Sequence, residues 1–104
     1  MASETVSKKQ RKIQEIEAQL AADPGSAELH AKLGGALLLA GATGKAEEAF
    51  GRALALDPEC IPALINLGGI YLSRWDFSKC VEFNRRAAAV APELVEAHYN
   101  EGLG

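Results

Sequence analysis

Residues 31–41 read AKLGGALLLAG, and residues 66–72 read NLGGIYL. The two LGG triplets begin at Leu33 and Leu67, which are 34 positions apart. The apolar residues around them have helical spacing, yet each glycine in a helix interior costs about 1 kcal/mol relative to alanine. A costly feature that returns at a fixed interval indicates a repeated unit in which the glycines have a structural role.

The central part of the chain repeats with the same period. Pro24, Pro58 and Pro92 follow one another at intervals of 34 positions. Residues 27–60 align with residues 61–94 without a gap, and 11 positions of this alignment are identical. Such a period predicts a solenoid, in which copies of one small unit are stacked along an axis.

The first unit carries the start and stop signals of two helices. Ser26 is predicted to cap a helix over about residues 27–40, which Gly41 ends. Thr43 is predicted to cap a second helix over about residues 44–56, which the following Asp-Pro pair ends.

The second unit carries matching signals. Pro62 suits the first turn of a helix, where its missing N–H is harmless. The chain is expected to turn near Arg74 and Trp75, and Asp76 is predicted to cap a helix over residues 77–90. Helices of about 14 residues that are joined by such short turns lie antiparallel.

Both units resemble the tetratricopeptide repeat at the positions of its signature, which is W-x2-L-G-x2-Y, then A-x3-F, then P. The first unit supplies His30, Leu33, Gly34, Leu37, Ala46, Phe50, Ala53 and Pro58. The second unit supplies Leu64, Leu67, Gly68, Tyr71, Cys80, Asn84, Ala87 and Pro92. Asn84 replaces the usual aromatic residue, and Phe83 beside it is expected to take over the packing.

The resemblance implies an all-α superhelix of antiparallel helix hairpins. Residues 12–26 resemble a second helix that closes on its own Asp-Pro pair. The expected organisation is a basic segment and capping helix (1–25), two repeats (26–59 and 60–93) and the start of a third repeat (94–104). Since the sequence stops within a helical pattern, we expect the chain to be a fragment of a longer array.

The resemblance gives the two glycines of each triplet different roles. The first glycine is expected where the antiparallel helices of a unit cross most closely, near Ala46 and Cys80. The second glycine, Gly35 or Gly69, is expected toward the inner surface of the superhelix. There it either widens the groove for a ligand or allows successive repeats to stack closely.

In tetratricopeptide arrays the first helices line a concave groove that receives a peptide. The resemblance places on this groove Ala31, Lys32, Gly35, Leu38, Leu39, Ile65, Asn66, Gly69, Leu72, Ser73, Tyr99 and Asn100. The amides of Asn66 and Asn100 are expected to bond either a ligand's backbone or a neighbouring helix. A groove that clamps a C-terminal carboxylate is not expected, because Ala31, Glu96 and Asn100 stand where it needs basic residues.

Composition argues against several other functions. The net charge is −3, which is unfavourable for nucleic acid, and no stretch approaches the length of a membrane span. Cys60 and Cys80 fit no metal or disulfide motif, which indicates the reducing cytoplasm. We expect Cys80 in the core and Cys60 partly exposed at a repeat junction.

Nothing in the sequence resembles a catalytic or cofactor motif. His30 and His98 are two repeat periods apart and are expected to pack within their own units. Glu47 and Glu48 are expected on a solvated helix face, with Arg52 one turn further on.

The sequence therefore predicts a non-catalytic, cytoplasmic scaffold that needs no cofactor and binds a protein or peptide in its groove. The alternative is a self-assembly module. An apolar end surface of the stack, formed by Phe83, Ala87 and Val90, would then be covered by a second copy to give a homo-oligomer through the terminal helices.

Overall fold

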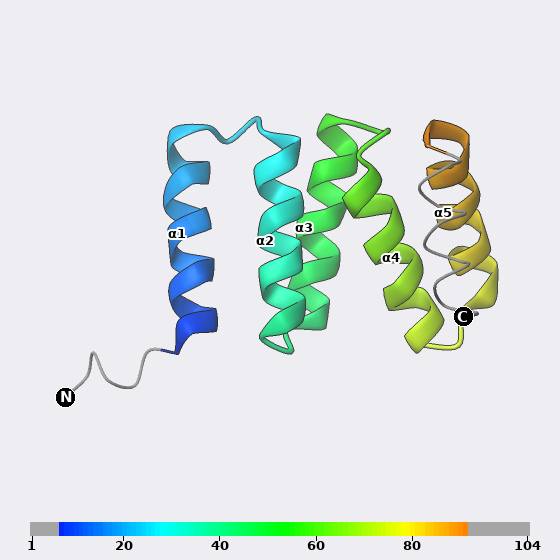
Figure 1. Ribbon diagram of the computed structural model, residues 1–104, viewed down its shortest axis with the longest axis horizontal. Helices are drawn as coiled ribbons and strands as arrows, with labels where there is room; N and C mark the ends of the chain where they lie inside the picture. The colour runs from blue at the N-terminus through cyan, green and yellow to red at the C-terminus, as the bar shows by residue number, and fades with distance from the viewer. Residues whose placement is uncertain (1–6, 92–104) are drawn as a thin grey trace.

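The computed structural model describes residues 7–91, which form five α-helices and no strand (Figure 1). The helices are α1 (Lys8–Ala22), α2 (Ala27–Leu39), α3 (Thr43–Leu56), α4 (Ile61–Ser73) and α5 (Phe77–Val90). Helix α2 pairs with α3 and α4 pairs with α5, while α1 packs on α2 and α3 packs on α4. This arrangement confirms the predicted all-α solenoid of stacked antiparallel hairpins. The predicted repeat boundaries remain a prediction, and residues 94–104 lie outside the described part.

Most helices begin where the capping residues predict. The Ser26 hydroxyl accepts a hydrogen bond from the Leu29 N–H (3.1 Å), and the Asp76 carboxylate accepts one from the Lys79 N–H (3.2 Å). Helix α1 begins earlier than residue 12, because Ser7 and Gln10 form a reciprocal capping box. The basic segment near the N-terminus therefore belongs to this helix.

One predicted cap is wrong. Thr43 is the first residue of α3, and Ala42 occupies the capping position without a side-chain hydrogen bond. The reason is the tight end of α2, where the Ala42 N–H bonds Leu37 O (2.8 Å) and the Gly41 N–H bonds Leu38 O (3.0 Å). These two bonds form a Schellman motif, which leaves room for only a short turn before α3.

The α4–α5 turn repeats this motif with an unusual residue. The Asp76 N–H bonds Tyr71 O (2.9 Å) and the Trp75 N–H bonds Leu72 O (3.0 Å). The motif needs a left-handed residue, which is Gly41 (φ 82°) in the first turn and Trp75 (φ 63°) in the second. This conformation costs a residue with a Cβ about 1–2 kcal/mol, so the second turn carries strain that the first one lacks.

The first glycine of each LGG triplet lies at the closest approach of its two helices, as predicted. A Cβ on Gly34 would lie 2.6 Å from Cε1 of the Phe50 ring, and a Cβ on Gly68 would lie 2.8 Å from Oδ1 of Asn84. Phe50 and Asn84 occupy equivalent positions, one turn beyond the predicted Ala46 and Cys80. The closest contact is therefore with this side chain, and at Gly68 the backbone oxygen of the predicted Cys80 also lies within reach, at 3.7 Å.

The core runs along the stack between the hairpins. Its largest fully buried side chains are Phe50 in α3 and Leu64 in α4. Cys80 is buried there, as predicted. Cys60 is also buried, with 7% of its surface exposed, so the prediction of partial exposure was wrong. Cys60 is the capping residue of α4, and the α3–α4 turn folds its side chain against the hairpins.

The two adjacent glycines of α2 give a matched pair of substitutions. Gly35→Ala should raise the free energy of unfolding by about 0.5–1 kcal/mol, because nothing lies within 4 Å of the new methyl group. Gly34→Ala should lower it by about 1–2 kcal/mol, because the Phe50 ring is fully buried and must move. Urea unfolding followed by circular dichroism measures both values, and equal effects would contradict the packing role of Gly34.

Candidate functional site

A shallow groove lies between the two first helices, α2 and α4. Its volume is about 400 Å³, and its lining residues are Leu38, Thr43, Ile65, Asn66, Gly69, Ile70 and Ser73. Five of the predicted groove residues thus meet in one place, with aliphatic side chains on both walls. Thr43 and Ile70 were not among the predicted groove residues; Thr43 had been predicted as a helix cap, and the sequence analysis gave Ile70 no role.

The other predicted residues of α2 lie around this groove rather than in it. Ala31 is buried, with 6% of its surface exposed, which leaves little of it for a ligand. Lys32 is exposed and pairs with Glu28 one turn earlier in the same helix, at 3.5 Å. Gly35 is half-buried, and Leu39 is largely exposed at the end of α2.

The remaining predicted groove residues, Leu72, Tyr99 and Asn100, come later in the chain and are not among the groove's described lining. Leu72 is half-exposed near the end of α4 and does not line the groove. Tyr99 and Asn100 lie outside the described residues, as do Glu96 and His98. The described lining of the groove comes from α2, α3 and α4.

Open space above two glycines shapes this surface. At Gly35 and at Gly69, no atom of residues 7–91 lies within 4 Å of the position that an added methyl group would take. The helices that pack on α2, namely α1, α3 and α4, are all described, and none of their atoms approaches the Cβ position at Gly35, so close stacking does not account for this glycine. Gly69 lies on the groove wall, where the missing side chain leaves the backbone of α4 accessible.

The amide of Asn66 has a bond that neither predicted alternative included. Its Nδ2 donates to the Pro62 carbonyl of its own helix (2.7 Å). This bond turns the amide so that the nitrogen is used within α4, and no described residue donates to Oδ1. The oxygen is therefore suited to accept a hydrogen bond from a backbone N–H in the groove.

A polar joint connects the two hairpins on another part of the surface. The Tyr71 hydroxyl donates to Glu47 Oε2 (2.5 Å), and Arg74 Nη1 donates to Glu47 Oε1 (2.7 Å). The Tyr71 ring stacks on Phe83, with 5.6 Å between ring centroids. Lys79 Nζ lies 4.9 Å from the Tyr71 centroid. We call this set the Tyr71 joint, and it ties α3 to both helices of the second hairpin.

The Tyr71 joint corrects the expected role of Glu47. The described residues contain the ion pairs Lys32–Glu28 and Arg74–Glu47, and no pair between Arg52 and Glu47 or Glu48. The hydrogen bond from Tyr71, followed by that from Arg74, holds the pKa of Glu47 below its usual value. The same bond to the carboxylate, followed by burial, raises the pKa of Tyr71. Glu47 thus acts between repeats rather than along its own helix.

The described histidine and the two cysteines have placements that fit structural roles. His30 Nε2 lies 3.0 Å from the Pro24 carbonyl in the α1–α2 turn, so the ring ties that turn to α2. Both cysteines are free thiols. No group of histidine, cysteine, aspartate or glutamate side chains in residues 7–91 is placed to hold a metal ion. None of the helices over this range combines the length and apolar character needed to cross a bilayer.

Comparisons with known proteins identify the fold. No protein family matches the chain, and no curated protein matches it. Among solved structures 21 chains match, including the crystal structure of MamA, which is 28% identical with a TM-score of 0.70. The match covers 77% of this chain and 47% of the MamA chain, so the chain spans about half the length of this neighbour. MamA contains tetratricopeptide repeats, and the fold described here is a tetratricopeptide-like superhelix.

The Tyr71 joint predicts a specific dependence of stability on pH. Since the pKa of Glu47 is lowered by folding, its contribution is complete above about pH 4.5 and is lost as the pH falls through the folded-state value. Since the pKa of Tyr71 is raised, its contribution is complete below about pH 10 and is lost as the pH rises further.

Tyr71→Phe should therefore lower stability at pH 7 by about 1 kcal/mol while keeping the ring stack on Phe83. The difference from the wild type should shrink at both extremes of pH. Urea unfolding at pH 3.5, 7 and 10.5 measures it, and Lys45→Ala, on the same face of the stack but outside the joint, is the control. A difference that is constant across the three pH values would contradict the assigned hydrogen bond.

Proposed function

We propose that this chain is a non-catalytic scaffold that holds a peptide segment of a partner protein in the groove between α2 and α4. The observation that carries the proposal is the groove itself, where aliphatic walls surround an exposed stretch of helix backbone at Gly69. The tetratricopeptide-like fold supports a protein-binding role, since arrays of this kind present concave surfaces to their partners. The buried free thiols agree with the cytoplasmic location that we propose.

The lining of the groove suggests the chemistry of the bound segment. Leu38 and Ile65 are partly exposed on the groove and favour an apolar side chain of the partner, because burying such a side chain yields about 1.5–3 kcal/mol. Asn66 Oδ1 and the Ser73 hydroxyl offer acceptors to backbone N–H groups. Lys32 follows Ala31 in the sequence, and its partner Glu28 offsets its charge. We therefore propose recognition through an apolar anchor and backbone hydrogen bonds rather than through a terminal carboxylate.

Filling the groove tests this proposal. Peptides that bind the purified chain are selected from a displayed random library, and their affinities are measured by fluorescence anisotropy. Gly69→Leu should weaken groove-binding peptides at least about 10-fold, because its side chain occupies the open space over α4. Asn66→Ala should weaken them by a smaller factor of about 5, corresponding to one hydrogen bond.

The matched control is Gly51→Leu. Gly51 is an exposed glycine of α3 with nothing within 4 Å of its Cβ position, and it does not line the groove. The chemical change and the gain in helix propensity are the same as at Gly69. Selected peptides that bind Gly69→Leu and Gly51→Leu equally well would place their site elsewhere and overturn the proposal.

Self-assembly remains the second candidate, but its predicted surface needs revision. Ala87 is buried and Phe83 is half-buried in the stack on Tyr71, so neither offers an open apolar end. Of the predicted surface Val90 is exposed, and the other large exposed apolar residues of this region are Trp75, Phe77 and Val81. A self-assembly function would therefore use the α4–α5 turn.

A further inference from the structure

A second and larger hollow lies between α1 and α3, over the side of α2. Its volume is about 710 Å³, which is within the usual range for ligand pockets. The floor is apolar and consists of Ile13, Leu33, Leu37, Ala40, Ala42 and Ala49. Acidic, basic and amide side chains form the rim, namely Gln10, Gln14, Glu17, Lys45, Glu48 and Arg52. We call this hollow the α1–α3 cleft.

The repeat itself explains why this cleft is open. The α1–α3 cleft and the Tyr71 joint are equivalent places in successive units, one repeat period apart. Five residues of the cleft align with residues of the joint 34 positions later in the sequence. The aligned pairs are Ile13 with Glu47, Leu37 with Tyr71, Ala40 with Arg74, Lys45 with Lys79, and Ala49 with Phe83. In the joint, a phenol ring stacked on Phe83 and an arginine fill the space. In the cleft, leucine and alanine leave it empty, so the cleft is a site from which the aromatic side chain is missing.

The chain also has one large aromatic side chain, Trp75, that is not packed into the fold. Trp75 is 79% exposed, and its aromatic neighbour within the described residues is Phe77, whose ring is perpendicular to it at 5.9 Å between ring centroids. Over the same range it is the one non-glycine residue with positive φ. The equivalent turn of the first hairpin uses Gly41, which adopts this conformation without strain. Backbone strain that presents a large apolar side chain to solvent suggests a binding role for that side chain.

We propose that the α1–α3 cleft of one copy takes up the Trp75 side chain of a second copy. The cleft has the apolar floor that an indole ring requires, and its rim supplies the acceptors for the indole N–H, in Gln14, Glu17 and Glu48. This contact is independent of the groove between α2 and α4.

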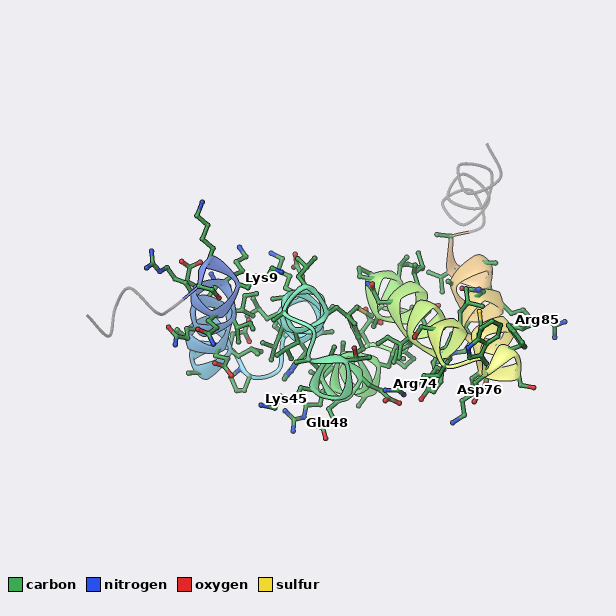
Figure 2. The ribbon with its side chains drawn as sticks, turned by 90° about the horizontal axis from the view of Figure 1, so that it is seen from below. Lys9, Lys45, Glu48, Arg74, Asp76 and Arg85 are labelled. Carbon is green, nitrogen blue, oxygen red and sulfur yellow. The ribbon has the colours of Figure 1, made fainter. Side chains whose placement is uncertain are left out.

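Charge and placement agree with this contact. The residues near Trp75 in the sequence carry both signs, with Arg74 before it, Asp76 after it and Lys79 in the first turn of α5. The cleft rim also carries both signs, so Asp76 can face Lys45 or Arg52 while the basic groups face Glu17 or Glu48. Figure 2 shows Lys45 and Glu48 of the rim on the same side of the molecule as Arg74 and Asp76 beside the turn. Two copies that face each other with these sides can therefore each insert a tryptophan into the other.

The sole tryptophan of the chain makes the contact measurable. Sedimentation velocity of the full chain from 5 µM to 1 mM should show a concentration-dependent rise in mass, with a blue shift of tryptophan emission over the same range. A chain that stays monomeric at about 1 mM, with the emission of a fully exposed indole, would overturn the proposal.

Two variants remove the two halves of the contact. Trp75→Gly removes the inserted side chain and should keep or raise the melting temperature, because glycine suits the left-handed turn. The double substitution Leu37→Tyr with Ala49→Phe fills the cleft with the residues of the Tyr71 joint. Each variant should weaken self-association about 30-fold or more, as expected for loss of an interface tryptophan. Self-association of Trp75→Gly at wild-type strength would overturn the proposal.

A mixture of the two variants gives the sharpest test. Trp75→Gly retains an open cleft, and the cleft-filled variant retains Trp75, so only the mixture contains one complementary pair. The mixture should form a 1:1 complex with blue-shifted emission, whereas each variant alone remains monomeric at the same concentration. A mixture that remains monomeric would overturn the proposal. Phe77→Ala, which removes the neighbouring aromatic residue but neither half of the contact, should weaken association much less than Trp75→Gly.

Discussion

The close approach of the two helices in each hairpin is the constraint on which the rest of the structure depends. At Gly34 the backbone of α2 lies directly against the ring of Phe50, and at Gly68 the backbone of α4 lies against the amide of Asn84. A side chain at either glycine would push the two helices of its hairpin apart. Because the first hairpin packs against the second through α3 and α4, such a shift would also change how the hairpins stack. The spacing and direction of the whole stack therefore rest on two positions without a Cβ.

The two glycine positions are equivalent, but the two hairpins are not held by the same partners. Phe50 fills the first hairpin with a fully buried ring. At the equivalent position of the second hairpin Asn84 is more exposed, and its Nδ2 lies 3.5 Å from Cys80 Sγ. Phe83, next to it, turns outward to stack on Tyr71. The aromatic side chain thus moves from the centre of the hairpin to the junction between hairpins, where it contributes to the Tyr71 joint.

Much of the fold followed from the sequence, since the repeat period, the LGG triplets and the caps at Ser26 and Asp76 are local signals. The details that failed depend on contacts that are distant in the sequence. Thr43 has the chemistry of a cap, but the end of α2 determines that Ala42 takes that position. Glu48 and Arg52 have the i,i+4 spacing of a helical pair, but no ion pair joins them in the described residues, and Glu47 finds its two partners in the next hairpin. The α1–α3 cleft was not predicted, because it becomes visible only when equivalent places of successive units are compared in space.

Because the two junctions are held by different contacts, local stability differs along the stack. The junction between the two hairpins has charged hydrogen bonds and an aromatic stack. The junction between α1 and the first hairpin has an unfilled hollow over aliphatic residues. Helix α1 further begins with Lys8 and Lys9 near its positive dipole end, which is unfavourable. In a linear array each unit is stabilised mainly by its nearest neighbours, so fraying begins at the weakest junction. Helix α1 is therefore the segment that detaches first, and the two hairpins joined at Tyr71 remain as the folded unit.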